Sequence, residues 1–157
     1  MSKWISYTNE KLYLARRQWV IGQQVTEVSD RLACHQGMLL LMQQAYIGML
    51  NELGETRKLR DKVQTLKELS EQSGFESEWI VQLRHLAKTP GSWLYELERG
   101  LSRMQAPAGD KGQTAVSEAS VPGLIASSTE APVEDGAFIL GQMSAFAAQL
   151  REYNYQY

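Results

Sequence analysis

Cysteine, histidine and an excess of charge of one sign are all scarce in this sequence. The single cysteine, Cys34, cannot form an internal disulfide, which favours a reducing compartment. The formal net charge is −2 at pH 7, so the chain has no basic excess of the kind that nucleic-acid-binding proteins usually carry. We therefore expect neither nucleic acid nor an acidic membrane surface among its partners.

Long hydrophobic runs are also missing from the sequence. The most apolar stretch, GMLLLMQQAYIGML at residues 37–50, contains Gln43 and Gln44 and is too short to span a bilayer. Residues 1–17 lack the apolar stretch of a signal peptide. These features predict a soluble cytoplasmic protein with no membrane association.

The residue patterns of common metal and cofactor sites are absent as well. Helical di-iron sites need a glutamate three positions before a histidine, whereas Leu32 and Gln82 precede His35 and His85 at that spacing. The sequence has no Cys/His cluster for zinc, no glycine loop for phosphate and no Gly-x-Ser-x-Gly turn. We expect no cofactor and no metal, and we assign no catalytic residue.

Helix-forming residues make up most of what is present. Glu, Lys, Arg, Gln, Leu and Met dominate residues 1–104, without convincing strand alternation. The 157-residue length favours a single domain. We predict an all-α fold, an antiparallel bundle of five to six helices. Residues 1–104 are expected to form the helical bundle, to which a C-terminal helix is added. Ser6 or Thr8 is expected to cap the first helix, which places Leu12, Ala15 and Trp19 on one face.

A stripe of ten positions, spaced alternately by four and three residues, follows the first helix. Nine of the ten are apolar or aromatic, as expected for one buried helical face. The positions are Ile21, Val25, Val28, Leu32, His35, Leu39, Met42, Tyr46, Met49 and Leu53. Because the phase never breaks, one long helix or two helices joined between Gln23 and Ser29 both fit. Ser29 and Asp30 suit an N-cap, which favours the break.

Three local signals predict where the next helices end and begin. Gly54 is a plausible C-cap, and Thr56 is expected to start the following helix. Ser73 and Glu76 have the spacing of a capping box. At residues 89–90, a threonine precedes a proline, and proline is tolerated at the first helical position. We therefore expect Thr89 to be the N-cap of a helix that starts at Pro90. The segment predicts a corner between two short helices.

The composition changes between residues 105 and 136. This segment contains three of the four prolines and no aromatic residue, so it predicts a disordered linker. An amphipathic helix is then expected over residues 137–157. Its apolar face repeats at steps of four and three: Ile139, Met143, Phe146, Leu150, Tyr153 and Tyr157.

The terminal helix has two possible locations. Closing a loop of this length costs about 3 kcal/mol above a constant. Burying each of the large apolar residues gains about 1.5–3 kcal/mol. We therefore expect the helix to pack back on the bundle of the same chain, although the same energies allow docking on a second copy or a partner. Its apolar face is our candidate interaction surface.

His35 is the one polar residue on the long apolar stripe. Its neighbour Cys34 points about 100° away on a helix, which disfavours a Cys–His pair. A buried histidine satisfied by Tyr46 or by a backbone carbonyl is the simpler interpretation. The alternative is a polar core site formed by His35, Arg31 and Tyr46.

Three segments together resemble a known family. They are YTNEKLYLARR near the start, LAKTPGSWLYEL at the corner, and the terminal amphipathic helix after a Pro/Ala-rich stretch. In these segments the chain resembles an uncharacterised bacterial domain-of-unknown-function family of small all-helical proteins. The resemblance implies a helical bacterial protein of the cytosol and no particular catalytic residue, ligand or partner.

Three functional hypotheses remain from the sequence. The leading one is a non-enzymatic interaction or adaptor protein, including one that associates with itself. The second is a small enzyme or nucleic-acid-processing protein that uses His35 and Arg31. The third is a binder of small hydrophobic ligands between helices.

Overall fold

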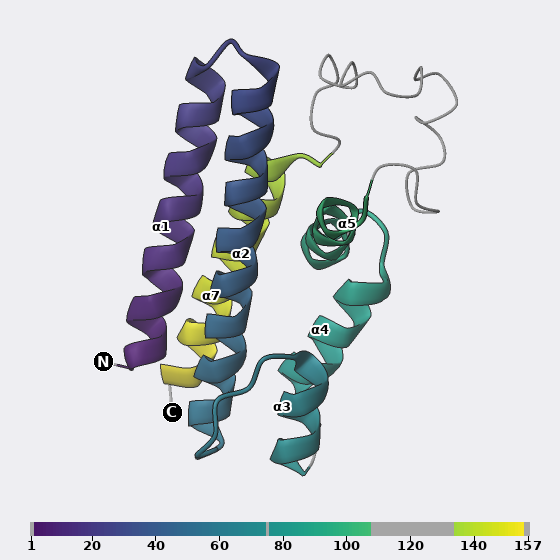
Figure 1. Ribbon diagram of the computed structural model, residues 1–157. Helices are drawn as coiled ribbons and strands as arrows, with labels where there is room; N and C mark the ends of the chain where they lie inside the picture. The colour runs from purple at the N-terminus through teal and green to yellow at the C-terminus, as the bar shows by residue number, and fades with distance from the viewer. Residues whose placement is uncertain (1, 75, 108–133, 156–157) are drawn as a thin grey trace.

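The computed structural model describes residues 2–74, 76–107 and 134–155, and these residues form helices without any strand. The helices are α1 (Lys3–Gln24), α2 (Val28–Thr56), α3 (Leu66–Ser73), α4 (Glu78–Lys88), α5 (Trp93–Gln105) and α7 (Gly136–Tyr155) (Figure 1). The all-α prediction is confirmed. The predicted disordered linker falls mainly on residues 108–133, which lie outside the described residues.

Helix α1 begins earlier than the sequence analysis predicted. Its N-cap is Ser2, whose Oγ accepts hydrogen bonds from the backbone N–H groups of Trp4 and Ile5 at 3.1 and 3.4 Å. Ser6 and Thr8 are therefore not caps. The Thr8 hydroxyl instead donates to the Trp4 carbonyl at 2.8 Å inside the helix. An earlier cap lets the helix bury Ile5 as well.

Helices α1 and α2 form a close antiparallel hairpin. A Cβ at Gly48 would collide with the hydroxyl of Thr8, and one at Gly22 would lie 3.2 Å from the Cβ of Cys34. Residues 25–27 are not helical, so the predicted break is confirmed and the single long helix is wrong. Helix α2 starts after Glu27 rather than after Ser29 or Asp30, because both of these residues already lie in its first turn.

Helix α2 continues to Thr56 and ends two residues beyond Gly54. Gly54 is buried inside the helix, and Thr56 does not start a new one, so both predictions are wrong. The chain instead forms a loop over residues 57–65. Asn51 fixes this loop, because its side chain donates to the Val63 carbonyl at 2.8 Å and accepts from the Val63 N–H at 2.9 Å. Val63 is buried, although it lies in a loop.

The predicted capping box is also wrong. Ser73 is the last residue of α3, and Gly74 ends that helix in the left-handed conformation at φ 72°. Helix α4 starts later, with Ser77 as its N-cap, whose Oγ accepts from the Ile80 N–H at 3.3 Å. Gly74, which can adopt a positive φ, fixes the end of α3 one residue after Ser73. The Ser–Glu spacing alone did not show that Ser73 lies before this boundary.

The corner at residues 89–92 is confirmed as a boundary between helices, but its residues have other roles. Thr89 is the C-cap of α4, and its hydroxyl donates to the His85 carbonyl at 2.7 Å. Ser92 caps α5 by accepting from the Tyr95 N–H at 3.2 Å. Between them Gly91 adopts φ 87°, so the turn is longer than a cap followed directly by Pro90.

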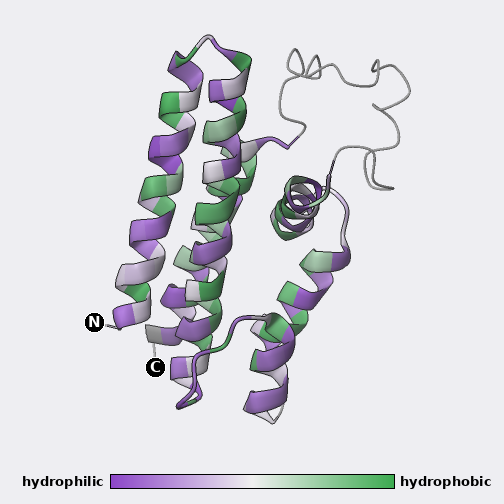
Figure 2. Ribbon diagram, viewed as in Figure 1, coloured by the Kyte–Doolittle hydropathy of each residue, from purple (hydrophilic) through white to green (hydrophobic). Residues whose placement is uncertain are grey.

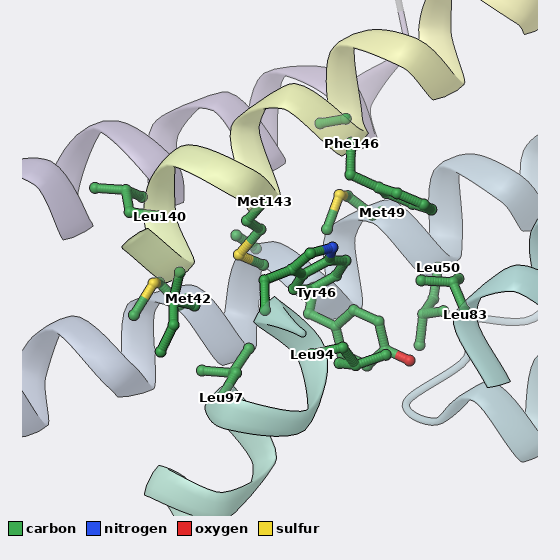
Figure 3. Close-up of a cluster of buried hydrophobic side chains, with 14 of the residues drawn as sticks. Met42, Tyr46, Met49, Leu50, Leu83, Leu94, Leu97, Leu140, Met143 and Phe146 are labelled. Atoms are coloured by element: carbon green, nitrogen blue, oxygen red, sulfur yellow. The ribbon is translucent and has the colours of Figure 1, made fainter. Parts of the chain in front are cut away.

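Helix α7 returns to the bundle and packs against α1, α2 and α5. In Figure 1, α7 lies behind α2, and α5 is seen end-on while the hairpin lies in the plane, so α5 crosses the hairpin. Figure 3 shows the resulting core, where Tyr46, Leu94 and Met143 meet from α2, α5 and α7. The Trp93 and Phe146 rings lie 5.5 Å apart at its centre. No helix among the described residues has the length and apolar character to cross a membrane.

Candidate functional site

The polar residue flagged by the sequence, His35, has a charged partner. Its Nε2 lies 3.1 Å from Oε2 of Glu134, at the start of α7. The prediction that Tyr46 or a backbone carbonyl would be the hydrogen-bond partner of His35 was wrong. Glu134 could not be found from the sequence, because the segment around it had the composition of a linker. It is nevertheless buried.

Arg103 of α5 completes this cluster. Its Nη1 donates to Oε1 of Glu134 at 3.0 Å, so one carboxylate joins α2, α5 and the start of α7. Burial alone would raise the pKa of the Glu134 carboxyl, but the hydrogen bond from His35 and the charge of Arg103 together lower it. The carboxylate is therefore held ionised. We call His35, Arg103 and Glu134 the upper ion cluster.

The structure does not assemble the polar core site of His35, Arg31 and Tyr46. Arg31 is exposed. Tyr46 lies eleven residues beyond His35 on the same helix, about 16 Å along its axis. The Tyr46 ring packs edge-on against Trp93 at 6.1 Å, and burial followed by the charge of Glu98 raises the pKa of its hydroxyl. The arginine that shares the Glu134 carboxylate with His35 is Arg103 rather than Arg31.

A second ion cluster fastens the other end of α7. Arg151 makes two hydrogen bonds to the buried Glu52 of α2, at 2.9 and 3.0 Å, and one to Asn9 of α1 at 2.8 Å. The planar guanidinium matches the carboxylate in this two-point contact. Neither Arg151 nor Glu52 was singled out from the sequence, since only contacts between distant segments bring them together.

The predicted interaction face of the terminal helix is largely used within the chain. Ile139, Met143, Phe146 and Leu150 are buried in the core, so these four side chains are not available to a partner of the folded protein. The prediction of an apolar face was correct, but this face packs against the other helices of the same chain. Tyr153 is 55% exposed and lies edge-on to Trp79, with ring centroids 5.8 Å apart. Tyr157 lies outside the described residues.

An exposed apolar surface lies instead on the distal half of the α1–α2 hairpin. No residue between 16 and 37 is buried. Trp19 is 37% exposed and Leu32 is 46% exposed. Figure 1 shows the hairpin rising past α5 and the start of α7, and Figure 2 shows apolar segments continuing toward its apex.

Helical spacing shows that this surface continues the covered face of the hairpin. Residues seven apart lie nearly two turns apart on the same face of a helix. His35 contacts Glu134, and Leu39 lies against Gly100. Seven positions earlier on α2 stand Val28 and Leu32.

The remaining covered positions have matching counterparts. On α2, Met38 lies under Gly136, and its counterpart seven positions earlier is Arg31. On α1, Asn9 accepts a hydrogen bond from Arg151 near the end of α7. Leu12 packs on the core, and its counterpart is Trp19. We call the exposed or half-buried residues Trp19, Val28, Arg31 and Leu32 the open face.

A pocket lies at the end of the bundle opposite the apex of the hairpin. Its volume is about 260 Å³. Five of its eight lining residues are polar or charged, which does not match the apolar slot expected for a hydrophobic ligand. The lining consists of Leu53, Thr56, Arg57, Ser77, Glu78, Trp79, Tyr153 and Asn154. Within the described ranges, no group of three or more His, Cys, Asp or Glu residues could hold a metal ion.

Comparison with known proteins gives one match. The model of a family of unknown function, DUF6586, matches residues 1–157. No curated protein and no solved structure matches the chain.

Proposed function

The chain belongs to DUF6586, a family of unknown function, and on that premise we propose that it is a non-enzymatic helical interaction protein that binds a partner through the open face. The proposal depends on one observation. The apolar stripe of the hairpin continues past the point where α5 and α7 stop covering it. The single half-buried cysteine, Cys34, fits a cytoplasmic setting for this interaction.

Exposure of large apolar side chains at neighbouring helical positions has a free-energy cost. Trp19 and Leu32 are 37% and 46% exposed, so each would gain on the order of 1 kcal/mol if fully buried. Scattered apolar residues on a surface need no explanation, but a stripe that extends a core without a cover is typical of a docking surface. We therefore propose the hairpin, and not the terminal helix, as the functional surface.

Site-specific photo-crosslinking in the native host tests this proposal. A photoreactive phenylalanine analogue at position 32 is expected to give a discrete crosslinked product. The matched control carries the same analogue at position 81, because Val81 is a similarly exposed apolar residue, 49% exposed, on α4. Equal products from both positions, or none from position 32, would refute the proposal.

The two alternative functions lack such support in the geometry. The enzymatic hypothesis required His35, Arg31 and Tyr46 to meet, and Tyr46 lies in a different part of the core. The ligand-binding hypothesis required an apolar slot, and the pocket near Tyr153 has a mainly polar lining.

A further inference from the structure

We draw no further inference here: the strongest candidate, the chemical identity of the partner of the open face on the distal half of the α1–α2 hairpin, carries nothing beyond the proposed function, because nothing in the structure shows what covers that face.

Discussion

At the scale of single residues, one carboxylate joins three helices that are distant in the chain. Glu134 contacts His35 of α2 and Arg103 of α5. We expect Glu134→Gln to lower the free energy of unfolding by about 1–3 kcal/mol, because the half-buried Arg103 loses its charge partner. Urea denaturation measures this change. The control Glu10→Gln, on the exposed side of α1, should stay within about 0.5 kcal/mol.

The same variant has an expected pH dependence. The folded chain lowers the pKa of Glu134 from its ordinary value of 4.5, so the folded state binds the proton less tightly than the unfolded state. The contribution of Glu134 is therefore present above about pH 5 and is lost as the pH falls through the lowered pKa. The stability difference between the original chain and Glu134→Gln should shrink in that acidic range, and a difference that grows there would contradict the assignment.

Residues such as Glu134 mark the limit of what the sequence could reveal. His35 was recognisable, because a polar side chain on an apolar stripe interrupts a repeat that one can count. Its partner stands 99 positions away in a segment whose composition predicts disorder. The local pattern indicates that His35 needs a polar partner. Only the packing of α7 against α2 and α5 determines that this partner is Glu134.

At the scale of helices, spacing predicted the buried face of the long stripe correctly only from Leu39 to Leu53, and it predicted the helix ends poorly. Met42 and Met49 of that stripe are buried as their spacing required, whereas Ile21 and Leu32 are exposed because α5 and α7 do not reach them. The ends depended on finer choices, because several Ser and Thr residues near each boundary could cap. Ser92 rather than Thr89 caps α5, since Gly91 can adopt a positive φ that lengthens the turn.

Helix α7 provides the clearest test at this scale. We expect Phe146→Ala to lower the free energy of unfolding by about 3–5 kcal/mol, because its ring is buried between Trp79 and Trp93. Phe138→Ala, on the same helix but 43% exposed, should have a much smaller effect. Chemical denaturation compares the two. Similar losses would mean that α7 does not pack on the bundle as described.

At the scale of the whole molecule, the bundle is unevenly filled. Side chains from α2, α4, α5 and α7 converge around Tyr46, whereas residues 16–37 contribute no buried side chain. Local stability follows the density of buried contacts, so the two ends of the hairpin should open with different free energies. A long helix that is rigid at one end and sparsely packed at the other suits reversible binding at the sparse end.

Hydrogen exchange followed by mass spectrometry should record this gradient in the full chain. We expect amides of residues 18–24 and 28–34 to exchange faster than those of residues 39–53 and 139–150, because the former open without disrupting the core. A partner bound to the open face should then slow exchange in the distal segments and leave the core segments unchanged. Uniform protection along α2 would contradict an uncovered apex, since it would require the distal half of the hairpin to be packed as tightly as the segment beneath α7.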